Sequence, residues 1–140
     1  MRLYFDLDTQ RLVDSSIGGI STTPITALDL KRRDGAALEI VFQRSGSQTP
    51  QVDDLPLSTE IHACAKQAFG GAEIINDAGF AWDAAKLAWT GPLSTNTVAL
   101  NDLFAPVEGV EPDSVALKFE VSFRVAASEP WQSSQTVILT

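Results

Sequence analysis

The segment VALKFEVSFRV, residues 115–125, decides the fold class of this chain. Its apolar residues stand two apart along the whole stretch: Val115, Leu117, Phe119, Val121, Phe123 and Val125. Successive side chains of a β-strand point to opposite faces of the sheet, so this period of two predicts a long strand with one buried and one wetter face. We expect it to be a central strand, and we expect its four middle apolar side chains to be among the most buried.

Weaker copies of this alternation recur in residues 3–7, 28–30, 38–42 and 61–66, and the chain finishes in the β-rich residues 136–140. Turn-forming residues separate them, and Asp34-Gly35 is a strong hairpin signal between two of these runs. Short strands at about ten-residue spacing with turns between them are typical of an all-β sandwich or barrel. We expect at least seven strands.

Helical signal is poor. Residues 63–69 contain helix formers, but the β-like alternation of the same region competes with them. Residues 101–105 fit one helical turn, with Asn101 as its N-cap. We therefore expect at most one or two short helical turns.

The composition is that of one globular domain. A chain of 140 residues with 44% hydrophobic residues has enough apolar material for a core without disulfides, and its single cysteine, Cys64, can form none within the chain. The formal net charge of −8 disfavours nucleic acid and anionic membranes as partners, because like charges repel. At the N-terminus an acidic residue, Asp6, comes before any long apolar stretch. We therefore expect no secretory signal peptide.

The first candidate for chemistry is the run Phe5-Asp6-Leu7-Asp8-Thr9. An apolar strand followed by Asp-x-Asp resembles the first motif of haloacid-dehalogenase-type phosphatases, where the two carboxylates act as nucleophile and acid/base around Mg²⁺. That chemistry also needs a parallel sheet with crossover helices, and this chain lacks the alternating strand and helix pattern. We interpret Asp6 and Asp8 as the polar face of a half-exposed strand entering a turn. Replacing both with Asn should leave the domain folded and remove no activity.

The second candidate is His62 and Cys64, which stand two apart on an expected strand and so share a face. Tetrahedral zinc needs three or four protein ligands, and the chain has no second His or Cys. A partly buried thiol beside a surface imidazole is the better interpretation. The acidic loop at residues 107–113 lacks the spacing of a compact calcium loop, so we interpret it as a solvated connection. We expect no metal and no cofactor.

The third candidate is aromatic. Exposed tryptophans on a β-sandwich can form a platform for carbohydrate, but aromatic residues also contribute most to a small core. The chain has Trp82, Trp89 and Trp131, and we favour core or subunit interface over sugar binding. Trp82 and Trp131 should be the most exposed, because Asp83 and Gln132 follow them.

One stretch resembles a known family. Residues 28–35, LDLKRRDG, followed by residues 38–42, LEIVF, are similar to the start of phage baseplate and tail-fibre N-terminal modules, such as that of the baseplate upper protein. The runs at residues 61–66, 88–89, 115–125 and 132–139 follow in the order of such a module. The resemblance covers residues 25–140. It implies an immunoglobulin-like antiparallel β-sandwich that assembles with copies of itself.

The function that this resemblance implies is that of a non-catalytic structural or assembly module of a phage or prophage tail. Such a protein is made in the bacterial cytoplasm and becomes part of the virion, and its partners are further copies of itself and other tail proteins. The first alternative is a carbohydrate-binding β-sandwich module. The second is a small metal-dependent phosphohydrolase that uses Asp6 and Asp8.

The domain organisation that we expect has two parts, and the chain should belong to a longer protein. Residues 1–21 should form a strand or hairpin followed by a tether rich in glycine and serine, and residues 22–140 should form the sandwich. A strand on a tether can pair with a neighbouring subunit, so we expect a homo-oligomer with residues 2–13 in its interface. The candidate interface residues are Leu3, Tyr4, Phe5 and Leu7.

Overall fold

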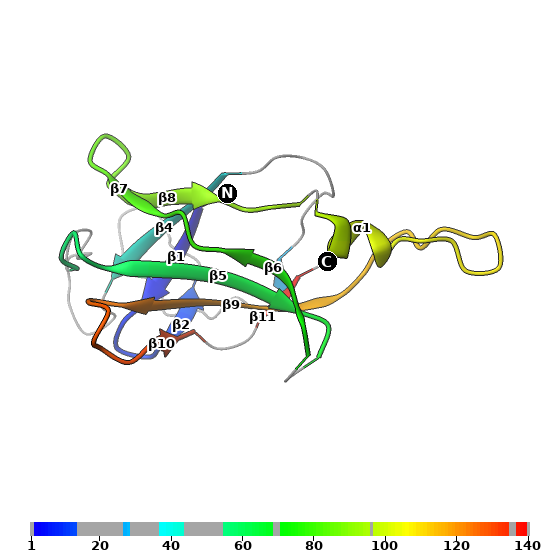
Figure 1. Ribbon diagram of the computed structural model, residues 1–140. Helices are drawn as coiled ribbons and strands as arrows, with labels where there is room; N and C mark the ends of the chain where they lie inside the picture. The colour runs from blue at the N-terminus through cyan, green and yellow to red at the C-terminus, as the bar shows by residue number, and fades with distance from the viewer. Residues whose placement is uncertain are drawn as a thin grey trace.

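The computed structural model describes residues 2–13, 27–28, 37–43, 55–68, 71–95, 97–134 and 137–139. These residues form eleven β-strands and one short helix, and the strands make two sheets that pack face to face (Figure 1). The expectation of a nearly all-β sandwich is therefore confirmed.

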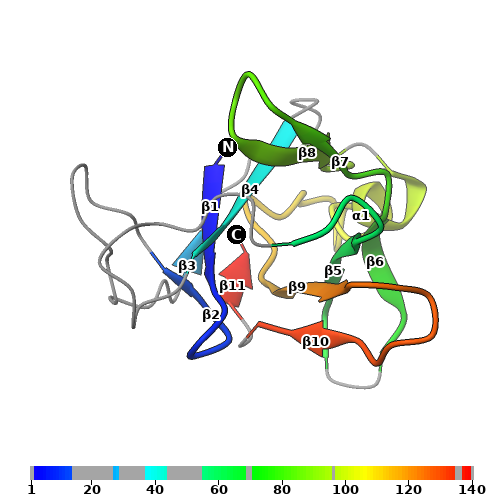
Figure 2. The same cartoon turned by 90° about the vertical axis from the view of Figure 1, so that its left-hand side faces the viewer.

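The first sheet, sheet A, has the strand order β2-β1-β4-β8-β7. Its strands are β1 (Arg2–Asp6), β2 (Arg11–Val13), β4 (Ala37–Gln43), β7 (Ala81–Asp83) and β8 (Ala88–Pro92). Sheet B has the order β3-β11-β9-β5-β6, and β10 also pairs with β9. Its strands are β3 (Ala27–Leu28), β5 (Glu60–Lys66), β6 (Glu73–Asp77), β9 (Leu117–Arg124), β10 (Gln132–Ser133) and β11 (Val137–Leu139). Figure 2 shows the two layers from one end.

Most strand pairs are antiparallel, but β1 pairs with β4 in parallel, and so does β11 with β3. The hairpin that Asp34-Gly35 predicts between its flanking runs is wrong, because β3 belongs to sheet B and β4 to sheet A. Asp34-Gly35 itself lies outside the described residues. β3 instead pairs with β11, and β4 pairs with β1 and β8, so each strand has partners that are distant in sequence.

The long strand predicted from residues 115–125 is β9, and it lies in the middle of sheet B. Its apolar side chains Leu117, Phe119, Val121 and Phe123 are all buried, as expected. The ring of Phe123 lies 5.4 Å from that of Phe5 and 5.2 Å from that of Phe42, both in sheet A. This aromatic cluster joins the two sheets at the centre of the core.

Residues 2–13 form the hairpin of β1 and β2, which is part of sheet A. β1 lies between β2 and β4, and its side chains Leu3 and Phe5 belong to the core shared by both sheets. In this fold Leu3 and Phe5 are not available to a neighbouring molecule, which differs from the interface expected for them, while Tyr4 and Leu7 are half-buried. The expected tether, residues 14–21, lies outside the described residues.

The one helix of the described chain, α1 (Val98–Asp102), begins earlier than the turn expected at residues 101–105. The N-cap is Thr97 rather than Asn101, and its hydroxyl accepts a hydrogen bond from the Leu100 N–H at 3.1 Å. A threonine hydroxyl satisfies a free N–H of the first turn, and the burial of Leu100 holds that turn on the sandwich. The sequence predicted the helical turn but not its start.

Candidate functional site

The acidic pair after β1 forms a turn. Asp6 is fully buried, and its carboxylate accepts hydrogen bonds from the Asp8 N–H at 3.0 Å and from the Thr9 hydroxyl at 2.7 Å. An Asp side chain that accepts from the backbone two residues later is the usual device for closing a turn. The expectation of a half-exposed Asp6 is therefore wrong, because these donors replace water around the carboxylate. Asp8 is exposed.

We expect Asp6→Ala to lower the free energy of unfolding by about 1–3 kcal/mol, because it removes the buried acceptor of the two hydrogen bonds that close the turn. Asp6→Asn should cost less, since the amide oxygen can still accept one of these bonds, and Asp6→Asn with Asp8→Asn should still fold. Urea denaturation followed by circular dichroism measures the differences, with Asp8→Asn as the exposed control. Magnesium-dependent hydrolysis of a phosphate ester that Asp6→Asn abolishes would contradict the structural role.

His62 and Cys64 lie on the face of β5 that points away from the core, since their neighbours Ile61, Ala63 and Ala65 belong to the core. His62 forms a side-chain hydrogen bond with Asn76 of β6. Burial raises the pKa of the Cys64 thiol to about 11, with a further contribution from Glu73, so the thiol is neutral near pH 7 and a poor nucleophile. Among the residues that the structure describes, no three His, Cys, Asp or Glu side chains gather closely enough to hold a metal ion.

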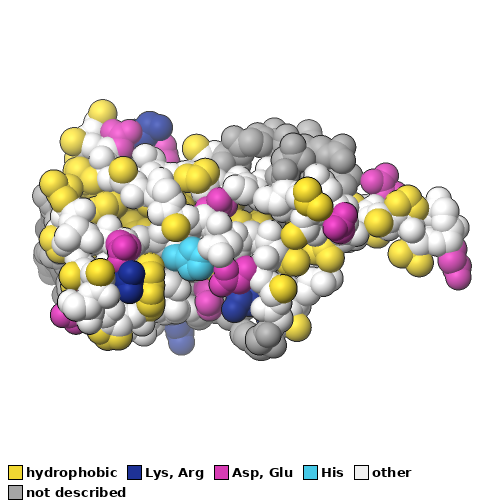
Figure 3. Space-filling view, in the orientation of Figure 1, with side chains coloured by type: hydrophobic (Ala, Val, Ile, Leu, Met, Phe, Trp, Pro, Cys, Tyr) yellow, Lys and Arg dark blue, Asp and Glu magenta, His cyan; other side chains and the backbone are white. Residues whose placement is uncertain are grey.

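Trp131 precedes β10 and takes part in a polar and aromatic cluster around His62, the one histidine of the chain, which is cyan in Figure 3. Its ring lies 6.1 Å from that of His62, and the Arg124 guanidinium lies 4.5 Å from its centroid, close enough for a cation–π contact. Arg124 also forms an ion pair with Glu60. Trp131 is 45% exposed, so part of its ring remains accessible to solvent beside the Arg124 guanidinium. We call these four residues the Trp131 cluster.

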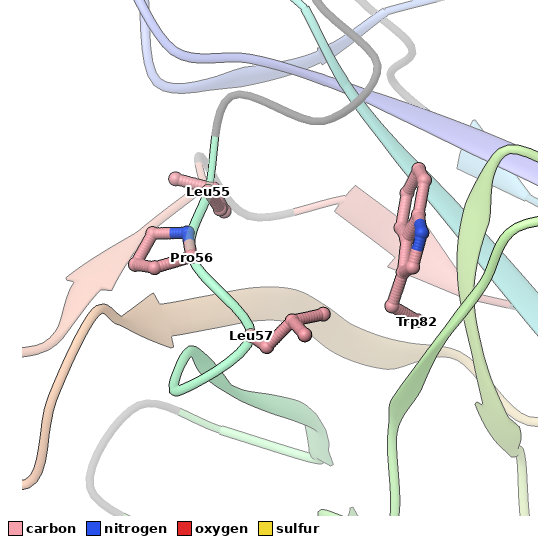
Figure 4. A pocket seen from close by; sticks show the side chains of 4 residues that line it. All are labelled: Leu55, Pro56, Leu57 and Trp82. Atoms are coloured by element: carbon pink, nitrogen blue, oxygen red, sulfur yellow. The ribbon is translucent and has the colours of Figure 1, made fainter.

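Trp82 occupies a different site. It is half-buried on β7, where its ring lies 5.8 Å from that of the buried Trp89. Opposite it, Leu55, Pro56 and Leu57 precede β5, and the four side chains line a pocket of about 320 Å³ (Figure 4). The side chains that line it are apolar apart from the indole N–H of Trp82, but polar atoms also contribute to its surface. No local sequence pattern indicated this pocket, because its two sides are more than twenty residues apart in the chain.

Residues 105–116 project from the sandwich beyond α1, and we call this segment the finger (Figure 1). At its tip Val107 and Val110 exchange two backbone hydrogen bonds, of 2.9 and 3.0 Å. Glu108 and Gly109 between them have φ values of 53° and 81°, as the two central residues of a type I′ hairpin turn require. The loop at residues 107–113 is exposed except for the half-buried Pro112, as expected of a solvated connection, and residues 107–110 of it form a hairpin. Val107 is 68% exposed and Val110 is 70% exposed.

The sequence contained a weak signal for this tip. A two-residue turn with glycine between two β-branched residues is a hairpin pattern, but Glu-Gly is less typical than Asn-Gly or Asp-Gly. The three acids of the segment indicated solvation, and all three are exposed in the structure. The exposure of the valines depends on the tertiary structure, which carries the segment away from the core.

Comparisons with protein-family models, with curated proteins and with solved structures find no match for this chain. Within the described residues no helix is long and apolar enough to cross a membrane. The function is therefore inferred from the Trp131 cluster and the finger tip.

Proposed function

We propose that this chain is a non-catalytic assembly module of a phage or prophage tail, in a baseplate or tail-fibre protein. It acts through self-association and through contacts with other tail proteins. The observation that carries the assembly role is the finger tip, where an ordered hairpin holds two valine side chains in solvent. Exposed apolar side chains gathered on one surface feature are typical of protein contact sites. The tail context, and an immunoglobulin-like topology, rest on the resemblance of residues 25–140.

The physical argument for a contact is the cost of leaving these side chains in water. Burying one valine stabilises a contact by about 1.5–3 kcal/mol. The two hydrogen bonds between Val107 and Val110 already fix the hairpin, so little conformational entropy is lost when a partner binds. A small contact of this kind is weak alone and gains strength in an assembly of several copies, where each further contact is intramolecular.

Native mass tests the proposal. We expect the intact chain to sediment as an oligomer at about 0.1 mM, a concentration far above the dissociation constant of a micromolar contact. The species should dissociate on dilution. A chain that stays monomeric at this concentration would contradict self-association.

A carbohydrate-binding module is the second candidate, and the Trp131 cluster is the observation that favours it. An exposed indole beside Arg124, His62 and Glu60 combines a stacking surface with hydrogen-bonding groups for sugar hydroxyls. Soluble oligosaccharides of glucose and of N-acetylglucosamine, titrated while tryptophan fluorescence is recorded, test it. Binding that Trp131→Ala abolishes and Trp82→Phe preserves would favour this candidate. The phosphohydrolase alternative is not favoured, because the Asp6 carboxylate holds the turn after β1.

A further inference from the structure

The outer face of sheet B carries aromatic and polar side chains that follow one another across the strands. Trp131 lies beside β10, and its ring approaches Arg124 of β9 and His62 of β5. His62 in turn forms a hydrogen bond with Asn76 of β6, the edge strand. Neighbouring strands are ~4.8 Å apart, so the line from β9 to β6 spans about 10 Å. We call Trp131, His62 and Asn76 the cross-strand strip.

We propose that the cross-strand strip binds an extended β-1,4-linked chain of glucose or N-acetylglucosamine, which runs from the ring of Trp131 across β5 toward β6. The inference rests on the carbohydrate-binding candidate and deepens it, because it adds Asn76 as a second contact and names the linkage of the sugar chain. It is independent of the assembly role of the finger tip.

The ring of Trp131 supplies the stacking surface. The Arg124 guanidinium lies 4.5 Å from its centroid on one side, and 45% of the residue remains exposed. In β-linked glucose and N-acetylglucosamine the ring substituents are equatorial, so the C–H bonds point to the two faces of the sugar ring and make them apolar. Such a face can pack on the exposed part of the indole, and the contact removes apolar surface from water on both partners.

The polar groups beside the ring keep hydrogen-bonding capacity after their internal contacts are counted. Of the five N–H groups of Arg124, one donates to Glu60 and one to the Ala127 carbonyl, so three remain. Glu60 is exposed and bonds Arg124 through one of its two carboxylate oxygens, so the other can accept. A sugar hydroxyl both donates and accepts, and a donor next to an acceptor can therefore bind two neighbouring hydroxyls.

Asn76 supplies a second contact at the other end of the strip. The amide oxygen of this exposed residue is the atom that meets His62, so its two N–H groups stay available. The bond to the imidazole holds the amide in place, which lowers the entropy lost when a sugar binds. These donors lie one strand beyond His62, on the path of a chain whose first unit stacks on Trp131.

The shape of the surface selects the linkage. The three residues of the strip stand along one sheet face rather than around a cavity, and in Figure 3 the imidazole of His62 (cyan) lies open at the surface. A β-1,4 linkage joins equatorial positions and gives a flat, extended chain, which can follow such a face over several units. An α-1,4 linkage bends the chain, so its next unit would leave the surface before reaching Asn76.

Isothermal titration of the full chain with cellotetraose, chitotetraose and the α-1,4-linked maltotetraose tests the proposal. Ligand at about 5 mM is sufficient to detect a millimolar dissociation constant. Three variants are compared: Trp131→Ala removes the stacking ring, Asn76→Ala removes the distal amide, and Gln67→Ala is the control, an exposed amide beyond the end of β5. Circular dichroism and thermal melting verify that each variant folds.

We expect at least one of the two β-1,4-linked tetramers to bind, about 10-fold or more tightly than maltotetraose. Trp131→Ala should weaken that binding by about 30-fold or more, as is typical when a central aromatic contact is lost. Asn76→Ala should weaken it by about 3- to 10-fold, the effect of one or two hydrogen bonds. Gln67→Ala should leave it unchanged.

The outcomes separate the proposals. The absence of binding by both β-1,4-linked tetramers, or binding that survives Trp131→Ala, would overturn this inference together with the carbohydrate-binding candidate. Binding that needs Trp131 but is equal for maltotetraose, or unaffected by Asn76→Ala, would keep that candidate and overturn the extended strip. The native mass of the chain tests the assembly role separately, and none of these titrations bears on it.

Discussion

Deletion of residues 1–21 should abolish folding of the remaining chain. The deletion removes β1 and β2, and β1 is an interior strand of sheet A that pairs with β4 through residues Arg2–Asp6. The deletion exposes one edge of β4 and takes Leu3 and Phe5 of β1 and Leu12 of β2 out of the core. At about 1.5–3 kcal/mol for each side chain, these three alone approach the 5–15 kcal/mol by which a typical domain is stable.

Circular dichroism and urea denaturation of the chain that starts at Thr22 test this expectation. We expect neither a β-sheet spectrum nor a cooperative transition. The single change Arg2→Ala serves as control, since it removes an exposed ion pair with Glu39 and should leave the fold intact. A shortened chain that unfolds cooperatively would restore the division into an opening segment and a separate sandwich.

Phe119→Ala should lower the free energy of unfolding by about 3–5 kcal/mol. Phe119 is fully buried in β9, where it pairs with Ala65 of β5 on one side and Val137 of β11 on the other. Removing the ring leaves a cavity in the central strand of sheet B, and the alanine opposite is too small to fill it. The neighbouring strands are fixed by their own backbone pairing and cannot close the space.

Urea denaturation monitored by tryptophan fluorescence measures this difference. Phe119→Leu, which keeps most of the volume, should cost less than the alanine change. Val110→Ala, at an exposed position on the finger, should change stability by no more than about 0.5 kcal/mol. A loss below about 1.5 kcal/mol for Phe119→Ala would place the side chain outside a well-packed core.

The sequence by itself determined the class of the fold and the inward face of its longest strand. The alternation in residues 115–125 is sufficient for this, because strand geometry alone sends every second side chain to the same face. The same local logic correctly indicated a helical turn near residue 100. It misplaced the N-cap, because Thr97 and Asn101 are both good caps and only the packing of Leu100 selects between them.

Strand partners and surface sites were decided by the tertiary structure. The pattern of residues 28–30 and 38–42 suited a hairpin, yet β3 and β4 lie in different sheets, since pairing is chosen by which faces can be buried together. Likewise, Leu3 and Phe5 are apolar residues of the kind found in subunit interfaces, but the structure places them in the core of their own chain. Alternation shows that a side chain will be buried, but not whether its own chain or a neighbour buries it.

The candidate contact surfaces illustrate the same limit. The pocket combines the segment before β5 with Trp82 of β7, so it exists only once the two sheets have packed. The hydrogen bonds of the finger tip join residues that are close in sequence, and the four residues Val-Glu-Gly-Val are sufficient to form its turn. Its exposure is not local, because whether a valine is buried depends on what the rest of the chain brings to it. Local geometry follows from neighbouring residues, whereas burial and exposure depend on contacts between residues far apart in sequence.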